Sequence, residues 1–166
     1  MLKAGAFVSY STTGICEISE IKKMGAAGKE KEYYVLKPVY QKNATVYIPL
    51  DNALLLSKIR PVVTKEEIDE IIIKAKNNPL EWISDDFDSN VAFKEILSSG
   101  NLLYIIRLVS CIYIQGEELS RTKRRLRAVD SSAFSNAESY LYNEFAFALN
   151  IKPEQVIEYI ENKMKE

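Results

Sequence analysis

Histidine is absent from the sequence, and cysteine occurs only twice, at Cys16 and Cys111. Without histidine the chain has no Ser-His or Cys-His nucleophile pair and no zinc site that needs imidazole. Two cysteines are too few for an all-thiolate zinc site, and their places inside apolar patterns favour buried free thiols over a disulfide. We therefore expect a protein that is not an enzyme and that carries no metal and no cofactor.

Long apolar runs are missing as well. No run reaches the roughly 18 residues that a membrane helix needs, and the N-terminal MLKAGAFVSY lacks the continuous apolar stretch of a secretory signal. The chain has 166 residues, of which 47% are hydrophobic and 27% charged, and this composition is typical of a globular protein. We expect a cytoplasmic protein with no membrane contact.

The first 62 residues predict a β domain. Four runs rich in valine, isoleucine, tyrosine and threonine are separated by turn-forming residues: AFVSY, GICEISEI, EYYVLKP and ATVYIPL. In the last run Val46 and Ile48 alternate with Thr45 and Tyr47, and Pro49 ends it. Because proline cannot donate a hydrogen bond to a neighbouring strand, we expect this run at an edge of the sheet, where another protein's strand can pair with it.

Residues 63–166 predict a bundle of about five helices, which makes the fold class α+β. Thr64 and Glu67 have the spacing of a capping box, and Gly100 is suited to end the next helix. Either Asp88 or Ser89 is expected to cap that helix.

The remaining helices have equally clear signals. Residues 101–115 are apolar almost all round, as in a helix at the centre of a bundle. A loop over residues 116–128 follows. Asp130 is then expected to cap a long helix, and Pro153 to open the last one.

Trp82 is the only tryptophan of the chain, and it lies in the stretch PLEWISDDFDSN, next to a proline-containing turn and ahead of three aspartates. No hydrophobic periodicity requires an indole at this place. A buried anchor and an exposed contact residue are both consistent with the pattern.

A basic run, RTKRRLR, precedes the long helix. A lysine or arginine that displaces a condensed counterion gains free energy when it meets a nucleic-acid backbone, so the run is a candidate phosphate contact. A solvated basic loop is an equally good interpretation of the composition. Its basic residues are Arg121, Lys123, Arg124, Arg125 and Arg127.

Several of these segments together resemble the CarD/CdnL family of bacterial RNA-polymerase-binding transcription regulators. The similarity lies in GKEKEYYVLKPVYQKNATVYIPLDNA, in the tryptophan after a short linker, and in KEILSSGN and LYNEFAFALNI. It extends over nearly the whole chain and is strongest at residues 28–53, 79–101 and 137–151.

The resemblance implies two domains with different partners. Residues 1–62 would form a Tudor-like or SH3-like domain that binds the RNA polymerase β subunit, of the kind shared with the transcription-repair coupling factor. The family's contact edge falls on TVYIP, which assigns polymerase binding to Thr45, Val46, Tyr47, Ile48 and Pro49. Residues 63–166 would form a helical domain that contacts promoter DNA.

The resemblance also assigns a role to Trp82. In the family the tryptophan wedges into the minor groove at the upstream edge of the transcription bubble, so that promoter open complexes are stabilised or modulated. The basic residues expected to accompany it on DNA are Lys94, Lys123, Arg124, Arg125 and Arg127.

The sequence departs from the family pattern at two places. Asp85, Asp86 and Asp88 follow Trp82 where relatives commonly have basic residues, and the long helix begins with Asp130, Ser131 and Ser132 where it is often basic in relatives. Carboxylates are unfavourable beside phosphate. We therefore expect sequence-nonspecific DNA binding that is weak unless the polymerase raises the effective concentration. A polymerase-bound adaptor with little or no DNA binding is the alternative. In either case we expect a monomer in the cytoplasm, associated with the nucleoid through RNA polymerase.

Overall fold

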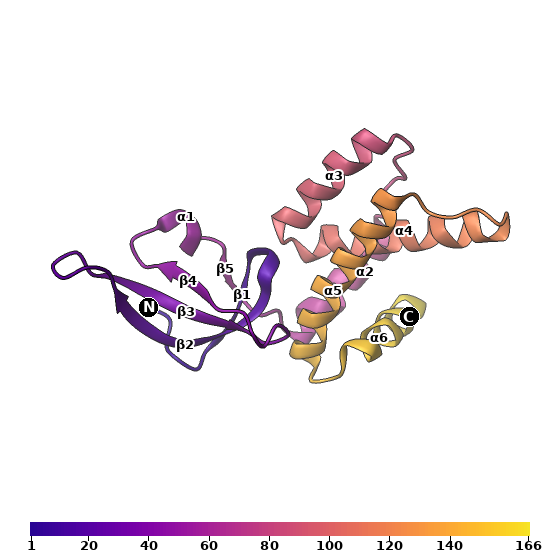
Figure 1. Ribbon diagram of the computed structural model, residues 1–166. Coiled ribbons are helices and arrows are strands. Elements are labelled where there is room, and N and C mark those ends of the chain that lie inside the picture. The colour runs from indigo at the N-terminus through magenta and orange to yellow at the C-terminus, as the bar shows by residue number, and fades with distance from the viewer. The chain divides into compact units, whose positions relative to one another are not determined.

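A computed structural model describes all residues, 1–166. The chain divides into two compact units, Met1–Val62 and Val63–Glu166. Figure 1 shows strands in the first and helices in the second. This arrangement confirms the predicted α+β fold class, an antiparallel sheet followed by a group of helices.

The N-terminal unit is built on one antiparallel sheet with the strand order β4-β3-β2-β1-β5. All four strands predicted from sequence are present, and β4 lies at an edge as expected. The fifth strand was missed because it is three residues long and ends in proline, which leaves no alternation to detect. The strands are β1 Phe7–Tyr10, β2 Gly14–Met24, β3 Lys31–Pro38, β4 Val46–Pro49 and β5 Ile59–Pro61. A short helix α1, Ala53–Leu56, lies between β4 and β5, and a 3₁₀ turn, Ser11–Thr13, between β1 and β2.

One face of this sheet carries the core of the unit. The side chains of Ile18, Leu36 and Ile48 are fully buried there, on the neighbouring strands β2, β3 and β4. The register of β2 on β3 shifts between Ile18 and Glu20, and the hydroxyl of Ser19 at the bulge donates to the Val35 carbonyl oxygen at 3.1 Å. Such a bulge increases the local twist of the sheet.

The second unit contains five helices, α2 Lys65–Asn77, α3 Asp86–Ser99, α4 Leu102–Arg121, α5 Ala128–Leu149 and α6 Pro153–Lys165. The predicted capping box is present: the Thr64 hydroxyl accepts from the Glu67 amide at 3.2 Å, and the Glu67 carboxylate accepts from the Thr64 amide at 2.8 Å. Gly100 ends α3 in the left-handed region, with φ 64°. Pro153 is the first residue of α6.

Three helix limits differ from the prediction. The cap of α3 is Asp85, not Asp88 or Ser89, and its carboxylate accepts the Asp88 amide at 2.9 Å. Helix α4 continues through half of the predicted loop, to Arg121. Helix α5 begins at Ala128, so that Asp130 lies in its first turn and does not cap it.

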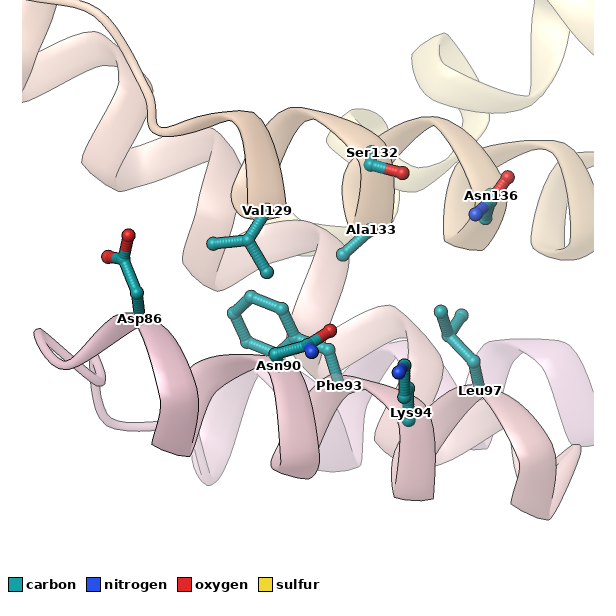
Figure 2. Close-up of a pocket in the computed structure, with 9 residues that line it drawn as sticks. All are labelled: Asp86, Asn90, Phe93, Lys94, Leu97, Val129, Ser132, Ala133 and Asn136. Atoms are coloured by element: carbon teal, nitrogen blue, oxygen red, sulfur yellow. The ribbon is translucent and has the colours of Figure 1, made fainter.

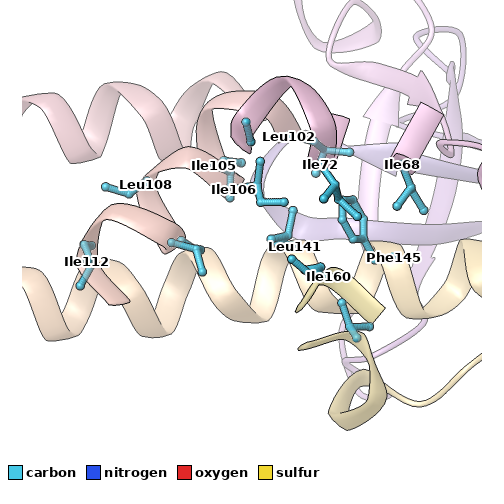
Figure 3. Close-up of a cluster of buried hydrophobic side chains, with 14 of the residues drawn as sticks. Ile68, Ile72, Leu102, Ile105, Ile106, Leu108, Ile112, Leu141, Phe145 and Ile160 are labelled. Carbon is cyan, nitrogen blue, oxygen red and sulfur yellow. The ribbon is translucent and has the colours of Figure 1, made fainter. Parts of the chain in front are cut away.

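The core of the helical unit is formed by isoleucine, leucine and phenylalanine side chains from several helices. Figure 3 shows Ile68 and Ile72 of α2 facing Leu141 and Phe145 of α5, with side chains of α4 beside them. Helix α4 contributes Ile105, Ile106, Leu108 and Ile112, all at most 1% exposed, which agrees with its predicted central place. None of the helices in either unit is long and apolar enough to cross a bilayer.

Candidate functional site

Strands β4 and β5 are the two edges of the sheet, and the main-chain pattern of β4 shows which of its groups face away from β3. The register pairs Tyr34 with Ile48 and Val35 with Tyr47, and just beyond the strand the Leu50 amide donates to the Glu32 carbonyl oxygen at 2.9 Å. Hydrogen-bonded and non-hydrogen-bonded pairs alternate in antiparallel sheets. Since Leu50 is hydrogen-bonded to β3, Ile48 two residues earlier is hydrogen-bonded as well, and its neighbour Tyr47 is not. The N–H and C=O of Tyr47 therefore point away from β3.

The side chains of this edge alternate in the same way. Ile48 is fully buried and anchors the strand in the core, whereas the Tyr47 side chain is 47% exposed. Thr45, just before the strand, is exposed, and Val46 and Pro49 are partly buried. The Pro49 carbonyl oxygen accepts from the Asn52 amide at 3.2 Å, so Tyr47 carries the main-chain groups that remain available to a partner.

Trp82 lies between α2 and α3 in residues 79–85, which have no regular secondary structure. Its indole is partly buried and packs against the core of the helical unit. The Arg127 guanidinium carbon lies 5.0 Å from the ring centroid, a distance typical of a cation–π contact. The indole is thus neither a fully buried anchor nor a freely exposed contact residue.

Arg127 connects this segment to the start of α5. Its Nε donates to Asp130 Oδ2 at 2.8 Å and its Nη2 to Asp130 Oδ1 at 2.7 Å, a bidentate pair. Asp130 is fully buried, while the Arg127 side chain keeps 24% exposure. Hydrogen bonding to Asp130, and then to Asp86, raises the pKa of Arg127 above its ordinary value.

The same guanidinium binds the chain just after Trp82. Nη1 donates to the Ser84 carbonyl oxygen and to Asp86 Oδ1, both at 2.8 Å. Nη2 donates to the Ile83 carbonyl oxygen at 2.9 Å and to the Ser89 hydroxyl at 3.0 Å. Ser89 is itself fully buried, and its hydroxyl donates to the Ile83 carbonyl oxygen at 2.9 Å.

The three aspartates after Trp82 have separate tasks in the structure. Asp85 caps α3, and Asp86 forms an ion pair with Arg127 although its own side chain is 74% exposed. Asp88 is exposed in the first turn of α3, where negative charge interacts favourably with the helix dipole. Carboxylates that are unfavourable beside phosphate are therefore used here to begin α3 and to hold Arg127.

The basic run divides into an inward and an outward part. Arg127 points to the carboxylates and carbonyl oxygens around Trp82, whereas Lys123, Arg124 and Arg125 are exposed in the loop between α4 and α5 and form no salt bridge. Lys123 adopts φ 58°, and the Arg124 Nε donates to the Thr122 hydroxyl at 3.3 Å. This loop presents three unneutralised positive charges to solvent.

Lys94 lies at a cleft of about 360 Å³ between α3 and α5. Figure 2 shows its side chain on α3, across from Ser132 and Asn136 of α5. The floor of the cleft is apolar and includes Phe93 and Ala133, both nearly buried. Lys94 itself is exposed, on α3, the helix that Asp85 caps.

The structure brings some of the predicted DNA-contacting residues together and keeps others apart. Trp82 and Arg127 are in contact with each other, while Lys123, Arg124 and Arg125 form a separate exposed loop. Two residues that hold the arrangement, Ser89 and Asp130, were predicted from sequence only as caps. The sequence did offer one signal for the ion pair between Arg127 and Asp130, because an arginine three residues before an aspartate can pair with it on a helix.

The fold defines a class of protein, a β domain with an exposed edge strand, joined to a separate helical unit. Residues 2–63 match the family model of the CarD-like/TRCF RID domain. The N-terminal unit therefore belongs to this family, the RNA-polymerase-interacting domain found in CarD-like proteins, and the resemblance drawn from sequence is confirmed for this part of the chain. CarD-like RID domains belong to RNA-polymerase-binding regulators that are not enzymes.

Proposed function

We propose that the protein is a transcription regulator that binds the RNA polymerase β subunit through β4 and modulates promoter open complexes through its helical unit. The observation that carries this proposal is the free edge of β4, centred on Tyr47, in a domain of the polymerase-interacting family. A monomer that follows the polymerase to the nucleoid is sufficient for this function.

Strand addition explains how such an edge would bind. A partner strand would pair with the outward N–H and C=O of Tyr47, while the exposed tyrosine ring and Thr45 would contact alternate side chains of the partner. Val46, Ile48 and Pro49 would act mainly by fixing the strand, since Ile48 is fully buried beneath it. Main-chain pairing would supply affinity, and Tyr47 would supply specificity.

The DNA side of the proposal rests on the exposed basic loop and on Trp82. Lys123, Arg124 and Arg125 carry charges that no carboxylate neutralises, so they are suited to phosphate contact without base reading. Lys94 would add a further positive charge on α3. Trp82 would insert at the edge of the bubble as an apolar wedge. Binding to the distorted DNA would then offset the free-energy cost of unstacking the bases.

The strand-edge contact can be tested by removing one backbone donor. Tyr47→Pro is expected to weaken polymerase binding at least about tenfold, since ~1.4 kcal/mol separates each factor of ten and both a hydrogen bond and the ring contact are removed. The substituted N–H points away from β3, so the sheet should be retained. Binding of purified polymerase, or of its isolated β-subunit lobe, by interferometry measures the effect.

Tyr47→Ala is the matched control for this prediction. It removes the ring but keeps the backbone donor, and it should therefore weaken binding less than Tyr47→Pro does. Equal losses of affinity in the two variants would mean that the interaction depends on the side chain alone. An unchanged affinity in both would show that β4 is not the polymerase-binding edge.

The basic loop can be tested by charge reversal. Arg124→Glu with Arg125→Glu is expected to weaken DNA binding in the polymerase complex and to lower the slope of log K against log salt concentration by about 1 for each phosphate that is no longer bound. Both side chains are exposed, so stability should not change. Salt titrations with a labelled promoter fragment measure the slope, and an unaltered slope would identify a merely solvated loop.

A polymerase-bound adaptor without DNA contact is the second candidate function. The partial burial of Trp82 under Arg127 and the exposed Asp85 and Asp88 favour it, because an indole held in protein and followed by exposed carboxylates approaches DNA less readily. The adaptor would bind polymerase with full affinity, but neither the basic loop nor Trp82 would alter open complexes.

A further inference from the structure

We propose that Arg127 is the positioning residue of Trp82, and that its guanidinium serves the indole and the chain after it instead of a DNA phosphate. This inference rests on the proposed function of Trp82 at the promoter. It departs from the sequence-based assignment of Arg127 to direct DNA contact, and it separates Arg127 from Lys123, Arg124 and Arg125.

The donors of Arg127 are already in use within the protein. A guanidinium has five N–H groups in a fixed fork, and Arg127 directs hydrogen bonds from Nε, Nη1 and Nη2 to six acceptor atoms of the protein. Two of these acceptors are the oxygens of the fully buried Asp130. A phosphate would have to replace bonds that already satisfy the cation, and would gain little by doing so.

These donors hold the segment that carries Trp82. Residues 79–85 form no helix and no strand, so ladder hydrogen bonds do not fix the backbone around the indole. The Arg127 bonds to the Ile83 and Ser84 carbonyl oxygens fix the chain directly after Trp82. The guanidinium also lies over the ring itself, 5.0 Å from its centroid. The Arg127 guanidinium thus contacts both the Trp82 side chain and the main chain that follows it.

Arg127 is itself held rigidly in place. Asp130 lies in the first turn of α5, and its carboxylate accepts the Arg127 backbone N–H at 3.2 Å as well as the guanidinium. The buried Ser89 hydroxyl joins Arg127 to the Ile83 carbonyl oxygen from the side of α3. Arg127 therefore places Trp82 relative to α3 and α5, and a side chain fixed in advance loses less entropy when it binds.

Lysine cannot replace this arrangement. An ammonium group carries three donors at one point and cannot span the Asp130 carboxylate, the two carbonyl oxygens and the ring at once. Arg127→Lys therefore keeps the charge that a phosphate would meet but removes most of the hydrogen bonds that hold Trp82. This difference separates a positioning role from a phosphate contact.

The only tryptophan of the chain makes the test specific, because all indole fluorescence reports on Trp82. In the full-length protein, Arg127→Lys is expected to increase acrylamide quenching of Trp82 and to shift its emission to longer wavelength. Arg121→Lys, an exposed arginine at the end of α4, is the matched control and should change neither. Quenching that is the same in Arg127→Lys as in the wild type would overturn the inference.

Promoter open complexes formed with the cognate polymerase provide the second readout. Their half-life with Arg127→Lys is expected to fall to the value measured with Trp82→Ala, and the double variant should cause no further decrease. Additive decreases in the double variant would show that Arg127 contacts DNA independently of Trp82. If Trp82→Ala has no effect on the half-life, the proposed function fails, and the quenching experiment still decides whether Arg127 holds the indole.

Circular dichroism identifies a variant that fails to fold because Asp130 is left without its partner. In that case Arg127→Gln combined with Asp130→Asn removes both charges together and leaves the carbonyl oxygens of Ile83 and Ser84 without the guanidinium. The folded double variant should show the same increase in Trp82 quenching. Wild-type quenching in this variant would also overturn the inference.

Discussion

Replacing Asp130 with alanine is expected to lower the free energy of unfolding of the helical unit by about 3 kcal/mol, because removing one partner of a buried ion pair leaves the other charge poorly solvated. Asp130 is fully buried and accepts two hydrogen bonds from the Arg127 guanidinium and one from the Arg127 backbone. We expect the low end of the usual range because the Arg127 side chain remains 24% exposed. Urea unfolding followed by far-UV circular dichroism measures the change.

Asp86→Ala provides the control for this experiment. Asp86 binds the same guanidinium, with a distance of 2.8 Å from Nη1 to Oδ1, but its side chain is 74% exposed. Exposed ion pairs contribute at most about 1 kcal/mol, so this variant should be much closer to the wild type. Similar destabilisation of the two variants would mean that burial of Asp130 is not what makes the pair important.

Replacing Trp82 with alanine is expected to shorten the lifetime of promoter open complexes about tenfold, while the affinity for polymerase stays the same. Stacking of a base on an aromatic side chain is worth ~1–3 kcal/mol, and ~1.4 kcal/mol is a factor of ten. The proposed polymerase contact lies on β4 in the other compact unit, so it should not depend on the indole. Challenge of preformed open complexes with heparin, with and without each variant, measures the lifetime.

Two further variants make the result interpretable. Phe87→Ala removes a 74% exposed aromatic ring on α3 and should leave the lifetime unchanged, which would separate the indole from a general loss of apolar surface. Trp82→Phe keeps part of the packing against the helical core and should retain part of the effect. If Trp82→Ala unfolds the helical unit, the indole is a structural anchor. If it folds and the lifetime does not change, the adaptor function is favoured.

The strands and the free edge were predictable because their signals are local. Alternation of apolar and polar residues places Ile48 inward and Tyr47 outward, and Pro49 marks a strand that cannot be bonded on both sides. The structure confirms this edge position. Strand β5 escaped prediction because its three residues, Ile59–Pro61, form a strand only by pairing with β1.

Helix limits in the second unit were less predictable where several residues compete for one cap. Asp85, Asp88 and Ser89 are all good caps; in the structure Asp85 is the cap, and Ser89 is buried beside Arg127. Asp130 was likewise predicted to cap α5, because aspartate is a favoured N-cap residue. In the structure Asp130 lies in the first turn of α5. Arg127 is the N-cap residue instead, and its backbone N–H donates to the Asp130 carboxylate.

The sequence alone determined the two-part organisation and the edge at Tyr47, because each is encoded by a local pattern of residue types. The polymerase-interacting family of the N-terminal unit followed from its resemblance to a known family. The environment of Trp82 was decided only by the tertiary structure. A single tryptophan and a basic run are compatible with several environments until residues 83, 127 and 130 are brought together. The hydrogen bond between Arg127 and Ile83 joins residues 44 positions apart, and it arises from the packing of α3 against α5, which no local pattern encodes.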